Sequence, residues 1–73
     1  MSGRSRSSGL SLRAIELIEK ALSDLLRLEL KIDELYKMGV LNEFELGELE
    51  GSIFIMKRVL ERRLGELRDY PPP

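Results

Sequence analysis

The sequence predicts an all-α fold, an antiparallel hairpin of two helices. Apolar residues recur every three or four positions through two long stretches, which is the period of an amphipathic helix. Between the stretches, Gly39 and Asn42 are residue types typical of a helix end and a helix start. The 73 residues include no Cys and no His, so neither a disulfide nor a histidine-bound metal can stabilise this short chain. We therefore expect self-association into a four-helix bundle or a larger helical assembly.

The first ten residues are predicted to form a flexible basic tail. They are mostly small and polar, and they include Arg4 and Arg6 but no acidic residue. Such a segment has little apolar surface to bury. It is either a frayed end without a role or an arm that contacts an acidic polymer.

The first helix is predicted over residues 11–38, with Ser11 as its N-cap. Its apolar residues cover about half of the helix circumference, and Leu26 and Leu30 widen this surface further. One neighbouring helix cannot cover so wide a surface. The first helix is therefore expected to contact more than its partner in the hairpin.

The turn is predicted at residues 39–42. Gly39 suits the left-handed conformation that follows many helices, and Val40 is the apolar residue that often comes next. Asn42 and Glu45 have the spacing of a capping box, in which each side chain accepts a hydrogen bond from the other's backbone.

The second helix is predicted over residues 43–69, and residues 70–73 end it because proline cannot continue a helix. A narrow apolar seam should pack on the first helix; it consists of Leu46, Leu49, Ile53, Met56, Leu60, Leu64 and Leu67. Glycines inside a helix are unfavourable, so Gly47 and Gly51 reflect either neutral drift or close packing against a second subunit. The predicted oligomer interface contains Gly47, Gly51, Phe54, Ile55, Val59, Leu26 and Leu30.

Charge is distributed unevenly along the predicted hairpin. The open half, residues 1–23 and 57–73, holds nine basic and five acidic residues, a net charge of +4. The turn half, residues 24–56, holds three basic and eight acidic residues, a net charge of −5. This polarity favours regular assembly of the rods. Alternatively, the basic end contacts phosphates through Arg4, Arg6, Arg13, Arg58, Arg62, Arg63 and Arg68.

The composition points away from catalysis. Without His, Cys or a glycine-rich loop before a helix, no nucleophile, base or phosphate cradle can be placed, so we expect no enzyme, cofactor or metal site. No apolar run approaches the roughly 18 residues of a membrane span. We therefore expect a cytoplasmic protein, or one assembled inside a cell, with no membrane partner. The lack of Gln and Thr beside 34% charged residues is typical of a thermophile protein.

The segment from Ile32 to Glu45, IDELYKMGVLNEFE, resembles the short helical hairpin family called SHOCT. In that family a Leu-rich helix is followed by a Gly and an apolar pair, and a Glu-Phe begins the second helix. Asn42 stands here where the family usually has Thr. The resemblance covers about a fifth of the chain and implies only an oligomerisation or interaction module.

These observations predict a non-enzymatic helical hairpin that associates with other copies of itself and needs no cofactor. One alternative is a nucleic-acid-associated assembly protein, such as a viral coat or filament subunit or a small chromatin protein, that uses the basic end. A further alternative is an adaptor that binds the helix of another protein beside Gly47, Gly51 and Phe54.

Overall fold

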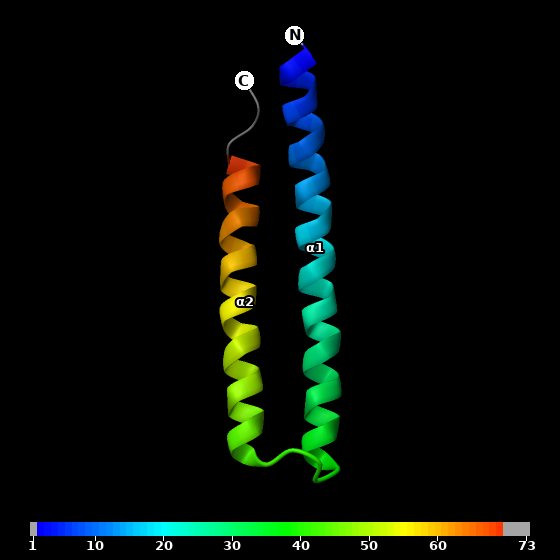
Figure 1. Cartoon of the computed structure of the whole chain (residues 1–73), viewed down its shortest axis with the longest axis vertical. Coiled ribbons are helices and arrows are strands. Elements are labelled where there is room, and N and C mark those ends of the chain that lie inside the picture. Colours follow the sequence, from blue (N-terminus) through cyan, green and yellow to red (C-terminus); the bar gives the residue numbers. More distant parts are fainter. Residues whose placement is uncertain (1, 70–73) are drawn as a thin grey trace.

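The computed structural model describes the backbone of residues 2–69 and the side chains of residues 11–69. It contains two helices, α1 (Ser2–Lys37) and α2 (Glu43–Asp69), which lie side by side and run in opposite directions (Figure 1). The described residues contain no strand. The predicted all-α hairpin of two antiparallel helices is therefore confirmed.

α1 begins at Ser2, nine residues before the predicted start at Ser11. Residues 2–10 thus belong to the helix instead of forming a separate tail. The segment contains no proline, and extending an existing helix is much easier than nucleating a new one. The predicted proline stop at residues 70–73 lies outside the described residues.

The end of α1 has the predicted glycine conformation. Gly39 has a φ of +82°, and its N–H donates to the carbonyl oxygen of Tyr36 at 3.0 Å. The N–H of Val40 donates to the carbonyl oxygen of Leu35 at 2.9 Å. These two bonds form the Schellman arrangement, which satisfies carbonyl groups that the helix end would leave without donors.

The start of α2 has the predicted capping box. The N–H of Glu45 donates to Oδ1 of Asn42 at 2.8 Å, and the N–H of Asn42 donates to Oε1 of Glu45 at 3.0 Å. In addition, the hydroxyl of Tyr36 donates to Oε1 of Glu43 at 3.4 Å, which links the end of α1 to the start of α2. Local hydrogen bonds therefore hold both sides of the turn.

The seam between the helices differs in part from the predicted one. Ile32 and Ile53 are its buried centre, but Leu49 and Met56 face outward and stay 38% and 42% exposed. Lys57 lies in the seam instead. The α2 seam residues Leu46, Ile53, Lys57, Leu60, Leu64 and Leu67 all lie at positions that are buried or half-buried.

An ion pair lies at this point of the seam. Nζ of Lys57 lies 3.3 Å from Oε1 of Glu29 on α1, and the two side chains are only 30% and 36% exposed. A half-buried carboxylate is stabilised when a cation lies beside it. Lys57 faces α1 in this pair, and the adjacent Met56 lies beside the seam.

Candidate functional site

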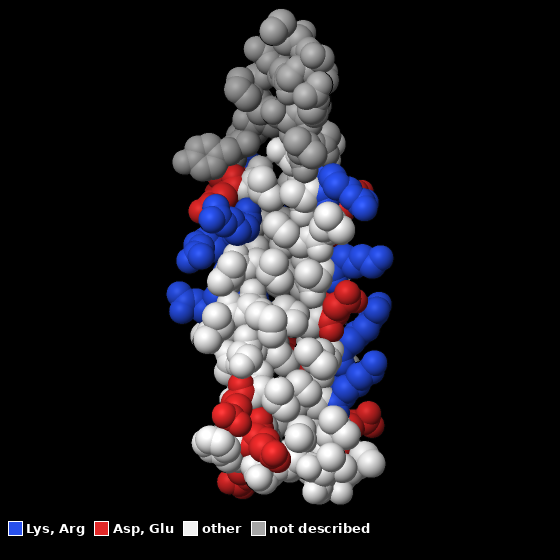
Figure 2. All heavy atoms as spheres, in the orientation of Figure 1, with Lys and Arg blue, Asp and Glu red and all other residues white. Residues whose placement is uncertain are grey.

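The most prominent surface feature is exposed apolar side chains. Among residues 11–69, Ile32 and Ile53 are the only buried ones, whereas fourteen large apolar side chains are at least 38% exposed. They are Leu12, Leu17, Leu26, Leu28, Leu30, Leu35, Met38, Val40, Phe44, Leu49, Phe54, Ile55, Met56 and Val59. Figure 2 shows one face on which uncharged surface runs along both helices, with charged side chains at its margins.

Seven of these fourteen residues lie next to the seam, four on one of its sides and three on the other. Successive residues of a helix are rotated by about 100°. Where two seam residues are four positions apart, the residue after the first and the residue before the second therefore lie on opposite sides of the seam. We call one side the alanine flank; its positions next to the seam are Ala14, Ala21, Leu28, Leu35, Leu49, Met56 and Arg63. We call the other side the glycine flank; its corresponding positions are Leu12, Glu19, Leu26, Asp33, Gly47, Phe54, Glu61 and Arg68.

Two contacts show that each flank contains surface from both helices. Arg68 of α2 forms an ion pair with Glu19 of α1 on the glycine flank. On the alanine flank, Ala21 of α1 and Met56 of α2 line the same hollow. Each flank is therefore a continuous side of the hairpin.

The alanine flank is almost entirely apolar. Of its seven positions next to the seam, only Arg63 carries a charge. The small side chain of Ala21 leaves a hollow of about 490 Å³, which is lined by Ala21, Asp24, Leu25, Ile55, Met56, Val59 and Leu60. Six apolar side chains and Asp24 thus line a shallow depression that nothing in the described chain fills.

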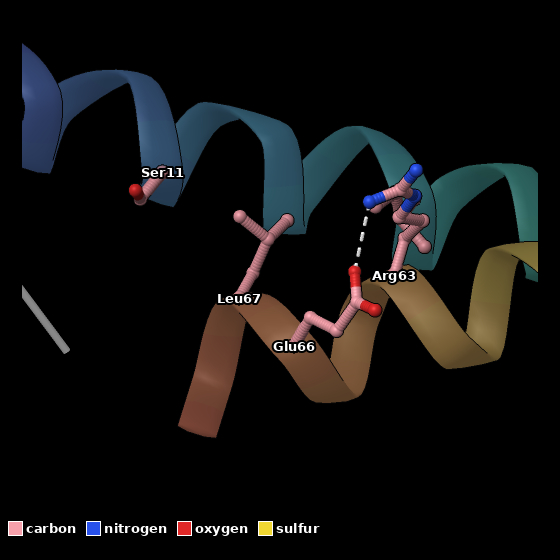
Figure 3. Close-up of a pocket in the computed structure, with 5 residues that line it drawn as sticks. Ser11, Arg63, Glu66 and Leu67 are labelled. Carbon is pink, nitrogen blue, oxygen red and sulfur yellow. Dashed lines mark hydrogen bonds and ion pairs between the residues drawn. The ribbon is translucent and has the colours of Figure 1, made fainter. Parts of the chain in front are cut away.

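A second hollow, of about 540 Å³, lies nearer the termini (Figure 3). It is lined by Ser11, Ile18, Arg63, Glu66 and Leu67. In the figure, Leu67 points toward α1, while Arg63 and Glu66 point toward each other and form an ion pair at 2.9 Å. The guanidinium of Arg63 is therefore neutralised at the edge of this hollow.

The glycine flank has a mixed character. Four of its eight positions next to the seam are charged: Glu19, Asp33, Glu61 and Arg68. Phe54 is exposed, and the guanidinium of Arg58 lies 5.9 Å from the centre of its ring. This distance permits a cation–π interaction, which covers part of the ring within the chain itself.

The predicted oligomer interface is divided between the two sides of the hairpin. Gly47, Phe54 and Leu26 lie on the glycine flank, and Gly51 and Leu30 lie further out on the same side. Val59 and Ile55 instead line the hollow of the alanine flank. A single flat contact cannot cover both groups.

The surface that contains Leu28, Leu35, Leu49 and Met56 was not predicted from the sequence. A signal was present on α1, because Ala14, Ala21, Leu28 and Leu35 recur every seven residues. On α2 the signal was masked, because Leu49 and Met56 have the spacing of seam residues.

Nothing within the hairpin requires glycine at positions 47 and 51. A Cβ atom at Gly47 or Gly51 would meet no atom of another residue within 4 Å, apart from its own neighbourhood in the helix. The close packing predicted for these glycines remains a prediction about a second subunit.

The arginines predicted to bind phosphate have different surroundings. Arg63 pairs with Glu66 and Arg68 pairs with Glu19, while Arg58 lies over Phe54. Arg62 and Arg58 line a small hollow of about 220 Å³ together with Ile55 and Val59, and Arg13 projects from the other helix. The side chains of Arg4 and Arg6 lie outside the described residues. Of the described arginines, two are thus paired with carboxylates and two lie beside the same small hollow, and phosphate binding stays a prediction.

Charge chemistry elsewhere is limited to surface pairs. Nζ of Lys37 lies 2.9 Å from Oδ2 of Asp33, and the hydrogen bond and the negative charge of this carboxylate raise the pKa of Lys37 above its ordinary value. Within residues 11–69, the acidic side chains form no cluster of three or more that could hold a metal ion. In the same part of the chain, neither helix has an apolar stretch that could cross a bilayer.

Comparisons with models of protein families, with curated proteins and with solved structures find no match to this chain. The resemblance of residues 32–45 to SHOCT therefore remains an expectation based on the turn residues.

Proposed function

We propose that this protein is a non-enzymatic interaction module that functions by associating with further copies of itself. The observation that carries the proposal is the imbalance between buried and exposed apolar residues. Within residues 11–69, the hairpin buries Ile32 and Ile53, and it leaves fourteen large apolar side chains exposed. Exposed apolar patches of this extent mark protein–protein contacts in other proteins.

Energetics support the same conclusion. Two helices alone form a very small core, and chains of this size usually need a disulfide, a metal or a partner subunit. The sequence contains no Cys or His. Burying one exposed Leu side chain contributes about 1.5–3 kcal/mol, so a few such residues in a shared interface add substantially to the stability of the hairpin.

The test is the molar mass by light scattering after size-exclusion chromatography. The measurement is made at several protein concentrations, at low and high salt, and with and without duplex DNA. We expect a discrete oligomer that persists in high salt, because apolar contacts are not screened by ions.

Two outcomes would contradict the proposal. A monomer at all concentrations would show that the apolar surface serves another partner, such as the helix of an adaptor's target. A species that forms only with DNA and dissociates at high salt would instead support the alternative of a nucleic-acid-associated assembly protein, because phosphate contacts weaken steeply with salt.

A further inference from the structure

We infer that the alanine flank is the surface on which a second copy docks, and that the two hairpins lie with their turns at opposite ends. This inference rests on the proposed self-association and specifies its face and its geometry. The resulting dimer is a four-helix bundle with a two-fold axis across the rods.

The distribution of charge selects the alanine flank over the glycine flank. Helices in a bundle carry apolar residues at the seam positions and along one adjacent side. On both α1 and α2 that side is the alanine flank, where Arg63 is the single charged position next to the seam. On the glycine flank, docking would desolvate four charged positions, including the Glu19–Arg68 pair.

The available area is sufficient for a dimer. The 27 residues of α2 extend over about 40 Å, and the hairpin is about 15 Å wide. The face therefore offers about 600 Å² per copy, or about 1,200 Å² in total, which is the lower end of specific interfaces.

Side-chain size favours the arrangement with opposite turns. The open half of the flank contains Ala14, Ala21 and the hollow of about 540 Å³, whereas the hollow of about 490 Å³ spans the boundary between the two halves. The turn half contains the larger residues Leu28, Leu35 and Leu49. When the turns lie at opposite ends, the large residues of each copy meet the alanines and the hollow of about 540 Å³ of the other, as close packing requires.

Charge favours the same arrangement. The open half carries a net charge of +4 and the turn half −5, so opposite turns bring unlike halves together and adjacent turns bring like halves together. The polarity is strongest on α2, where residues 43–56 include four acidic and no basic residues. Helix dipoles do not favour either arrangement of the turns, because all neighbouring helices are antiparallel in both.

A matched pair of variants tests the face. Leu28 and Leu26 are the same residue type, two positions apart on α1, and 42% and 56% exposed. We expect Leu28→Lys, on the alanine flank, to raise the dissociation constant of the dimer at least about 100-fold. Leu26→Lys, on the glycine flank, should leave the molar mass unchanged.

A second pair on α2 repeats the test in case Leu28→Lys fails to fold, as judged by circular dichroism. Met56→Lys should dissociate the dimer, whereas Phe54→Lys should not. If the variants on the glycine flank dissociate the dimer and those on the alanine flank do not, self-association stands but the docking face is wrong. A monomeric wild-type protein would instead overturn the proposed function itself.

The relative position of the two turns is tested with a single substitution. The chain has no Cys, so Val40→Cys places a single spin label on the turn. With the turns at opposite ends, the distance between the two labels is about 40 Å or more, from the length of α2. A distance within about 25 Å, as expected when neighbouring helices about 10 Å apart bring the turns together, would overturn the arrangement.

Discussion

Replacing the helical glycines by alanine distinguishes a solvent-exposed glycine flank from a packed one. Gly47 and Gly51 lie inside α2, and a Cβ atom at either position meets no other residue within 4 Å. If the second copy docks on the alanine flank, both positions remain open to solvent in the dimer. Alanine then reduces the conformational freedom of the unfolded chain without any steric penalty.

The expected magnitude follows from helix propensity. Each change should raise the free energy of unfolding by about 0.5–1 kcal/mol, and the double variant by about 1–2 kcal/mol. For a domain of this size, each kcal/mol raises the melting temperature by about 4–8 °C. The matched control is Gly39→Ala, because the φ of +82° at Gly39 makes the same chemical change unfavourable by about 1–2 kcal/mol.

Thermal and urea unfolding, followed by circular dichroism at one fixed protein concentration, measure these changes. The molar mass of each variant is determined in parallel, because stability and association are coupled in an oligomer. If Gly47→Ala or Gly51→Ala lowers the melting temperature and reduces the mass, another backbone approaches the glycine flank. That result would refute the reasoning and restore the glycines as interface residues.

Further substitutions test three individual interactions. Asn42→Ala should lower the free energy of unfolding by about 1 kcal/mol, because a capping bond at 2.8 Å is lost, while Asn42→Asp should keep most of it; equal urea midpoints for both variants would contradict this. Lys57→Met alone should destabilise the hairpin by about 1–2 kcal/mol, because the half-buried carboxylate of Glu29 loses its partner. Adding Glu29→Leu should recover that loss, and a double-mutant cycle that shows simple additivity would argue against the pair. Asp33→Asn should return the raised pKa of Lys37 toward its ordinary value in an NMR titration. Since that pKa is raised, the pair's stabilisation should be complete below the ordinary lysine pKa and disappear as the pH rises through the raised one.

The turn was predictable from sequence because its interactions are local. Gly39, Val40, Asn42 and Glu45 act on backbone groups only a few residues away, so their types and spacing are sufficient to predict the hydrogen bonds. The early start of α1 was not predicted, because the small polar residues before Ser11 carry no apolar period.

The seam on α2 was predicted only in part, because a helix with apolar residues on several sides allows more than one docking angle. Met56 and Lys57 are adjacent, and a pattern of hydrophobicity favours Met56 for the seam. In the structure Lys57 takes the seam position and pairs with Glu29 on the other helix. Glu29 lies 28 residues away in the sequence and comes close only after the hairpin closes.

The sequence by itself determined that the chain forms two amphipathic helices and where it turns, since periodicity and caps act within one or two helical turns. Only the tertiary structure decided which side chains face α1, and hence that the exposed apolar residues divide into an apolar alanine flank and a partly charged glycine flank. The physical reason is that the rotation of each helix about its own axis depends on contacts with the other helix. A small rotation exchanges seam residues such as Lys57 for surface residues such as Met56.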